Sequence, residues 1–297
     1  MNRTALSPKE MAEAIGVSES SLKRWADGGL IRVARTAGGH RRISLPEAVR
    51  FVREQGIPVV RPELLGLPEV SSLQLELQRA GSETDRLYDF LTTGRSKEAR
   101  GVVTSAYLRG TSAAQLADDI IAPAMARVGD LWRHDPAGIF VEHRATDIMI
   151  QAVNQLRLLI EPPANAPEAV GGAPAGDPYV LPSLLVATVL TAEGYHAVNL
   201  GANCPTESLL QAAQQHKARL AWISVSGVTL EPFLARDMVD FSGKLAAMGT
   251  RLIVGGRTRP VLPAGSDRHI QTGVTMAELA AFARGLLAAD DARQQAS

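Results

Sequence analysis

The sequence predicts a multidomain protein: an α winged helix-turn-helix, a four-helix bundle, and an α/β Rossmann-like doubly wound parallel sheet. Three patterns support this. Short capped helices and a Gly-Gly hairpin fill the first fifty residues, apolar residues at three-to-four spacing fill the middle, and apolar runs alternate with helices toward the end. We expect domains at 1–55, 79–162 and 163–297, with a linker at 56–78.

Composition excludes several classes of protein. Thirty-one basic residues balance thirty-one acidic ones, so a charged partner can be inferred only from local clustering. The N-terminus has no secretory core and no run approaches the ~18 apolar residues of a membrane span. We therefore expect a cytoplasmic protein with no membrane partner. The single cysteine, Cys204, excludes an internal disulfide framework.

The first fifty residues carry explicit helix signals. Ser7 is placed to cap one helix, with Glu10 completing a capping box, and Ser18 to cap a second. Gly38-Gly39 then lies between two strand-like arms, which predicts a β-hairpin. Ser44 opens a third helix, SLPEAVRFVREQ.

Basic side chains gather on the second helix and the hairpin. A helix fits the major groove of DNA, while hairpin arginines reach phosphates or the minor groove. These residues therefore predict an interface with double-stranded operator DNA. They are Lys23, Arg24, Arg32, Arg35, His40, Arg41 and Arg42.

This order of elements and the GGHRR turn resemble the MerR family of winged-helix transcription regulators over about residues 5 to 54. The resemblance implies dimeric binding with the hairpin, or wing, on the DNA backbone. Arg41 and Arg42 match the family's wing arginines, and Lys23 and Arg24 lie on the matching recognition helix.

Four amphipathic segments follow, and we expect them to pack as a bundle. They read ETDRLYDFLTTG, SKEARGVVTSAYLRG, SAAQLADDIIAPAMARVGDLWRHD and GIFVEHRATDIMIQAVNQLRLLI. Within them Trp132 is followed ten residues later by Glu142 and then by His143. As isolated residues, Trp132 and His143 would be ordinary core side chains and Glu142 a surface acid.

The order Trp-x9-Glu-His resembles the helical cap of cobalamin-binding regulators of the CarH and CarA type. The resemblance implies that Trp132 packs on the upper axial group of the corrin and that Glu142 and His143 hydrogen-bond it. Light-dependent members also use a histidine directly after the tryptophan to bind cobalt. Here Arg133 stands there and His134 follows, a quarter turn away around a helix.

Strand-helix alternation from about residue 168 predicts a parallel sheet, and ligands bind such sheets at the carboxyl ends of the strands. Those ends read GDPYVLPS, GANCP, SVSGVT and GGRT. The candidate ligand-binding residues there are Asp177, Tyr179, Cys204, Ser224, Ser226, Gly255 and Gly256.

This domain after a Trp-x9-Glu-His bundle resembles the cobalamin-binding Rossmann-like domain, so that the likeness covers about residues 80 to 290. The family's first loop reads Asp/Glu-x-His-x-x-Gly, whose histidine binds cobalt from below. Aligned on Asp177, this chain has Tyr179 and Pro182 in place of the histidine and glycine. Phenolate is an unusual partner for alkyl-bearing Co(III), so the lower-ligand role does not transfer to Tyr179.

Three hypotheses about the ligand stay open. Cobalamin, as adenosylcobalamin, binds with its own base on cobalt; a different tetrapyrrole such as biliverdin binds, attached by a thioether at Cys204; or the site has lost its ligand. The residues do not assign a metal site.

No convincing paired carboxylates, activated nucleophile or phosphate loop appear, so we expect no enzyme. The sequence predicts a transcription regulator, a repressor that senses light through a tetrapyrrole and binds its operator as a homo-oligomer, a dimer or tetramer. The alternatives are a corrinoid-handling methyl carrier or chaperone and a ligand-independent regulator controlled by a protein antagonist.

Overall fold

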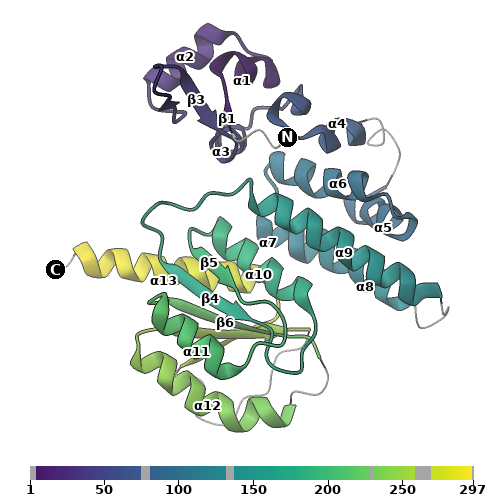
Figure 1. Ribbon diagram of the computed structural model, residues 1–297, viewed down its shortest axis with the longest axis vertical. Coiled ribbons are helices and arrows are strands. Elements are labelled where there is room, and N and C mark those ends of the chain that lie inside the picture. The colour runs from purple at the N-terminus through teal and green to yellow at the C-terminus, as the bar shows by residue number, and fades with distance from the viewer. Residues whose placement is uncertain (1–4, 75–80, 132–136, 228–230, 258–268, 296–297) are drawn as a thin grey trace. The chain divides into compact units, whose positions relative to one another are not determined.

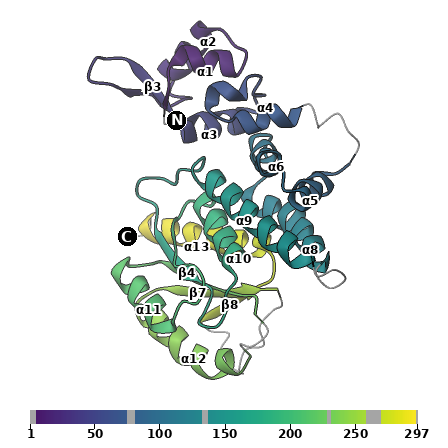
Figure 2. The same ribbon diagram turned by 45° about the vertical axis from the view of Figure 1, so that its right-hand side comes forward.

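The computed structural model describes residues 5–74, 81–131, 137–227, 231–257 and 269–295. Two compact units emerge from the contacts between residues, and Figures 1 and 2 show them from two directions. The N-terminal unit comprises Met1–Ser112 and Asp119–Glu161, and the C-terminal unit comprises Ala113–Asp118 and Pro162–Ser297. The predicted winged helix-turn-helix, residues 1–55 and called the head below, therefore shares one unit with most of the predicted bundle.

The head begins with two helices, α1 (Pro8–Ala14) and α2 (Glu19–Asp27), followed by α3 (Leu45–Gln55). All three predicted caps are confirmed. Ser7 forms the complete capping box with Glu10, and the side chains of Ser18 and Ser44 each accept a hydrogen bond from the backbone three residues on.

A small antiparallel sheet accompanies these helices, in the order β1-β3-β2. It comprises β1 (Ala5–Leu6), β2 (Ala34–Arg35) and β3 (Arg41–Ser44). The predicted hairpin is present, but its first arm forms only two residues of strand. Gly39 turns the chain with a φ of 78°, a conformation that favours glycine.

Residues 62–74, predicted as part of a linker, are instead structured. They form the 3₁₀-helix η1 (Pro62–Leu65) and helix α4 (Pro68–Gln74). Their apolar side chains are buried, including Leu65, Leu67 and Leu73. Abundant proline and glycine suggest a linker here, but Pro62 and Pro68 stand at the first helical positions, where proline is favourable.

The helical domain follows the four predicted segments. It contains α5 (Glu83–Thr93), α6 (Ser96–Leu108), α8 (Ala122–Leu131) and α9 (Ala137–Arg157), which pack on one another. The third predicted helix is divided, because α7 (Ala113–Gln115) and a π-helical turn (Leu116–Ile121) precede α8. Most of that first part belongs to the C-terminal unit.

Helix α4 crosses α6 at Gly101. A Cβ atom at this glycine would lie 2.6 Å from the main-chain oxygen of Glu69, closer than real Cβ atoms approach. The Glu69 side chain is itself buried and accepts a hydrogen bond from Gln155 of α9. A glycine in α6 therefore lets the former linker pack directly on the helical domain.

The C-terminal unit contains a five-stranded parallel sheet in the order β5-β4-β6-β7-β8. Its strands are β4 (Glu168–Gly172), β5 (His196–Asn199), β6 (Leu220–Val225), β7 (Arg251–Gly256) and β8 (Ile270–Gly273). The parallel sheet is confirmed. The sequence prediction missed β8, whose four residues IQTG lack a long apolar run.

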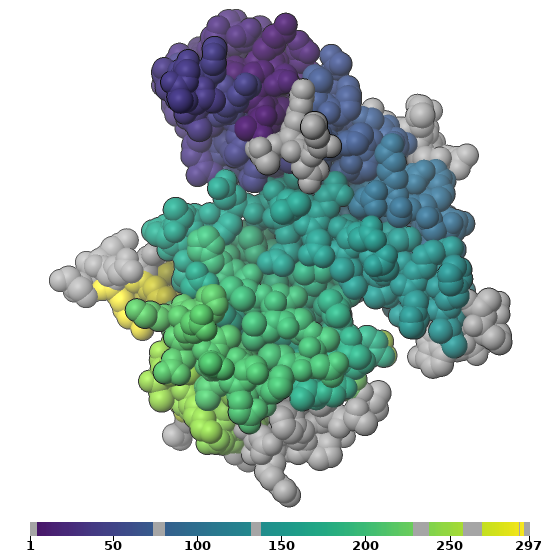
Figure 3. Space-filling model, in the orientation of Figure 1, coloured from purple at the N-terminus to yellow at the C-terminus, as the bar shows by residue number. Residues whose placement is uncertain are grey.

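Helices cover both faces of this sheet (Figure 1). Helices α10 (Val180–Ala192) and α13 (Met276–Gln295) share one core with it, and α11 (Thr206–Gln215) and α12 (Glu231–Ala247) share the other. Side chains close the gaps between the ribbons of α11 and α12 in the space-filling view (Figure 3). No helix among the described residues has the length and apolar character that a bilayer span requires.

The crossing at Gly101 predicts a specific sensitivity. Gly101→Ala is expected to lower the free energy of unfolding by about 1–3 kcal/mol, because the added methyl group must displace main chain. Gly129→Ala is the matched control, since α8 leaves open space around Gly129 and alanine favours a helix by up to about 1 kcal/mol. Urea denaturation compares the two. Equal or reversed shifts would contradict the close crossing.

Candidate functional site

The predicted DNA-binding residues lie together on the head, on α2 and on the β2–β3 hairpin. Most of them are exposed to solvent, and three of them form ion pairs with carboxylates of the same domain. The exposed residues are Lys23, Arg24, Arg32, Arg35, His40 and Arg42. Lys23 forms an ion pair within α2 with Glu19, at 3.2 Å.

The two wing arginines are not equivalent. Arg42 is exposed, whereas the Arg41 side chain is only 27% exposed and its Nη2 donates to Asp27 Oδ1 of α2 at 2.6 Å. Alternation along β3 explains the difference, because Arg41 shares a face with the buried Ile43 and Arg42 faces the other way. Arg41 therefore ties the hairpin to α2, and Arg42 is free to contact phosphate.

Arg32 is also engaged inside the head. Its backbone nitrogen and its Nε each donate to the carboxylate of Glu47 at 2.7 Å. Glu47 is almost fully buried on α3, and it also accepts hydrogen bonds from Arg50. Burial alone would raise the pKa of Glu47, but the hydrogen bonds from Arg50 and Arg32 outweigh it and lower that pKa. In the sequence Glu47 is only the third residue after Ser44 at a helix start, and no local pattern indicates its contacts with Arg32.

The predicted contacts to an upper axial group are only partly described. Trp132 and His134 lie outside the described residues. Glu142 and His143 lie in the first two turns of α9, where the His143 side chain is 76% exposed and Glu142 accepts a hydrogen bond from Thr146 at 3.2 Å. Two large apolar side chains, Ile139 and Phe140, are exposed on the same turns. This end of α9 thus presents apolar and polar groups together.

Asp177 organises the loops at the carboxyl edge of the sheet. Its side chain is fully buried, and Oδ2 accepts hydrogen bonds from the backbone nitrogens of Ser226 at 2.5 Å and Gly227 at 3.0 Å. Oδ1 accepts from the backbone nitrogen of Tyr179 at 3.0 Å. The carboxylate therefore joins the loop after β4 to the loop after β6.

Tyr179 does not reach into this edge. It precedes the first residue of α10, is 47% exposed and makes no capping hydrogen bond through its side chain. Pro182 lies in the first turn of α10, where proline is tolerated. The stretch AGDPYVLPS is thus a helix start whose buried acid holds two loops together.

The described histidines of the C-terminal unit lie at the opposite edge of the sheet. His196 begins β5, His269 directly precedes β8, and His216 follows α11 beside the start of β4. The segments 228–230 and 258–268, whose structure is not described, contain no histidine in the sequence. No imidazole of this unit is therefore placed to bind cobalt at the carboxyl edge.

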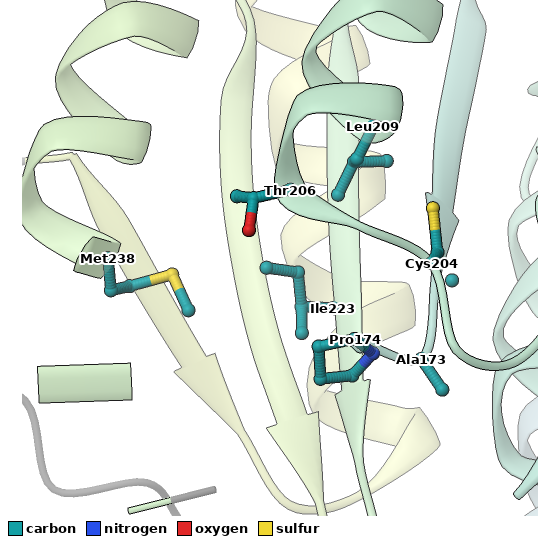
Figure 4. Close-up of a pocket in the computed structure, with 8 residues that line it drawn as sticks. Ala173, Pro174, Cys204, Thr206, Leu209, Ile223 and Met238 are labelled. Carbon is teal, nitrogen blue, oxygen red and sulfur yellow. The ribbon is translucent and has the colours of Figure 1, made fainter. Parts of the chain in front are cut away.

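A small apolar pocket opens beside the end of β4 (Figure 4). Its volume of about 10 Å³ holds roughly one water molecule. The lining includes Cys204, Met238 and Ile223. Cys204 is partly buried, its Sγ lies 3.6 Å from the Pro205 oxygen, and burial raises the pKa of the thiol. A protonated thiol is the weaker nucleophile.

The other candidate residues at the strand ends have structural roles that explain their presence. Ser224 is buried in β6, whereas Ser226 joins Asp177 through its backbone nitrogen. A Cβ atom at Gly255 would lie 2.7 Å from the Gly273 oxygen of β8, and one at Gly256 would overlap the Val225 oxygen of β6. Both glycines therefore permit close strand packing. No cluster of three or more metal-binding side chains occurs in the described part of the chain.

Comparison with known families assigns two segments. Residues 7–43 match the MerR family regulatory protein, and residues 83–157, which span α5 to α9, match the B12 binding domain. The chain joins a MerR-type domain to a B12-binding-type domain. Both assignments agree with the resemblance seen in the sequence, and the parallel sheet fits the Rossmann-like part of such proteins.

One solved structure supports this fold, and two others show a weaker likeness. The monomethylamine corrinoid protein of Methanosarcina barkeri has 20% identity and a TM-score of 0.50, over 69% of this chain and 98% of its own. A chain of the methanol:cobalamin methyltransferase complex of the same organism has 18% identity and a TM-score of 0.34, over 73% of this chain and 84% of its own. A cobalamin-binding protein of Desulfitobacterium hafniense DCB-2 has 17% identity and a TM-score of 0.33, over 67% of this chain and 96% of its own. No curated protein gave a significant match.

The buried carboxylate of the C-terminal unit predicts a second sensitivity. Asp177→Ala leaves three backbone nitrogens without their acceptor, and we expect a loss of about 3 kcal/mol in the free energy of unfolding. Asp240→Ala is the control, since this exposed acid on α12 pairs with Lys244 and should change stability by less than about 1 kcal/mol. Thermal unfolding followed by circular dichroism compares them; equal stability of both variants would refute the role of Asp177.

Proposed function

We propose that this protein is a DNA-binding transcription regulator that senses a corrinoid and has no catalytic activity of its own. The observation that carries the proposal is the presence, in one compact unit, of a MerR-type segment and a B12-binding-type segment. A DNA-binding head packed on a corrinoid-binding domain is expected in a sensor and has no use in a simple carrier.

The head supplies the DNA contacts. Lys23 and Arg24 on α2 are oriented to solvent as a helix entering the major groove requires, and Arg42 on the hairpin is free for phosphate. One such head binds DNA modestly, so we propose that a homo-oligomer engages the operator through several heads.

The proposed ligand is a corrinoid that keeps its own nitrogen base on cobalt. Glu142 and His143, next to exposed Ile139 and Phe140, would contact the upper side of the ligand. The carboxyl edge of the sheet offers Tyr179, which is exposed, and no imidazole. When bound, the corrinoid supplies a cobalt centre whose upper ligand changes with its chemical state, and the protein distinguishes those states through the residues on α9.

Light as the input, repression as the output and biliverdin as the chromophore remain predictions from the sequence. The raised pKa of Cys204 and its partial burial give no support to a thioether at that residue. Among the alternatives, the methyl carrier is disfavoured because no described histidine of the C-terminal unit lies at the carboxyl edge to serve as a lower ligand of cobalt. Control by a protein antagonist has no specific observation in its favour.

The ligand proposal is tested by binding. We expect the purified full chain to retain cobalamin in equilibrium dialysis and to bind cobinamide, which lacks the base, at least about tenfold more weakly. Tyr179→Phe should bind cobalamin as the unaltered protein does, because the phenol is not a ligand. Retention of neither compound would refute corrinoid sensing, and equal binding of both would refute the requirement for the corrinoid's own base.

The DNA proposal predicts a salt effect. Arg42→Ala should weaken operator binding and reduce the slope of log K against log salt by about 1, because one phosphate contact is lost. Fluorescence anisotropy at several salt concentrations measures this slope. Arg127→Ala, in the helical domain, serves as the control and should leave the slope unchanged. An unchanged slope for Arg42→Ala would exclude Arg42 from the interface.

A further inference from the structure

The last turn of α3 is anchored in the helical domain by Arg53. Its guanidinium donates hydrogen bonds through Nη1 to the main-chain oxygens of Tyr107 and of Thr111, the latter at 3.0 Å. The same guanidinium lies 3.6 Å from the centre of the Tyr107 ring. Three interactions of one side chain thus join the head to the carboxyl end of α6.

The chemistry of this contact suits a fixed joint. The last carbonyls of a helix lack partners inside the helix and carry partial negative charge, so a cation is favourable there. Burial lowers the pKa of Arg53, with the charge interaction with the Tyr107 hydroxyl acting in the opposite direction, and burial raises the pKa of Tyr107. The guanidinium is therefore withdrawn from water and held by carbonyl oxygens and an aromatic face, an arrangement that tolerates little displacement.

Helix α3 also holds both DNA-reading elements. The Phe51 ring lies 5.3 Å from the Trp25 ring of α2, and the buried Glu47 carboxylate holds Arg32 at the start of the hairpin. One helix consequently contacts the recognition helix, the hairpin and, through Arg53, the helical domain.

We propose that Arg53 is the joint by which the corrinoid state of the helical domain controls the DNA-reading elements of the head. The regulatory part of this inference rests on the proposed function. Movement of the carboxyl end of α6 carries Arg53 and α3 with it, and α3 displaces α2 and the hairpin together. Loss of the joint uncouples the head from the helical domain and removes the support that α3 gives to α2 and the hairpin.

Hydrogen exchange tests the joint in the full chain without any corrinoid. Arg53→Ala should increase amide exchange by about tenfold in α2 and β3 as well as at the carboxyl end of α6, the scale of one lost hydrogen bond to a charged group. Arg53→Lys keeps the charge but loses the planar stack, and should give a smaller increase. Circular dichroism establishes that both variants fold.

Arg127→Ala is the matched control, because Arg127 makes the same kind of stack, 4.0 Å from the Tyr88 ring, inside the helical domain. It should leave exchange in α2 and β3 unchanged. Exchange in α2 and β3 that is unaltered by Arg53→Ala, or altered equally by Arg127→Ala, would overturn the proposal.

A second arm adds cobalamin and follows its binding by absorbance. Bound cobalamin should change exchange in α2 and β3 of the unaltered protein and have no such effect in Arg53→Ala. Cobalamin that binds without this difference would overturn transmission through Arg53. Failure of cobalamin to bind would refute the proposed function, while the ligand-free arm still decides whether Arg53 is the joint.

Discussion

The close crossing of α4 over α6 is the contact on which the N-terminal unit depends. With the Glu69 oxygen directly above Gly101, the chain between the head and the helical domain lies against α6, and Leu65, Leu67 and Leu73 are buried. The head then approaches α6 closely enough for Arg53 to reach the helix end. A MerR-type domain and a B12-binding-type domain thereby share one compact unit, which is the structural basis of the coupling proposed above.

A buried acid, Asp177, connects the loops at the carboxyl edge of the sheet in the C-terminal unit. Asp177 satisfies three backbone nitrogens from two loops, so the loop that resembles a cobalt-ligand loop is held in place without a histidine. Packing of neighbouring strands accounts for Gly255 and Gly256. The described part of this edge offers no imidazole, which is why the proposal above assigns recognition of a corrinoid to residues on α9 and to the ligand's own base.

Local signals in the sequence predicted much of this fold. The caps at Ser7, Ser18 and Ser44, the hairpin and the alternation of strands and helices depend on neighbouring residues, and they are present. The engagement of Arg41 by Asp27 and of Arg32 by Glu47 depends on residues 14 and 15 positions away, which no local pattern shows. A proline in the sequence is compatible either with a linker or with the first residue of a helix. Only the structure shows that Pro62 and Pro68 begin helices.

The central claim is that corrinoid binding and DNA binding are linked through one body. The most direct measurement is operator affinity of the full chain at increasing cobalamin concentration, with cobalamin affinity measured with and without the operator. The account predicts a change of about fivefold or more in operator affinity and the same factor in cobalamin affinity, since linkage is reciprocal. Operator affinity that stays constant while cobalamin binds would contradict it.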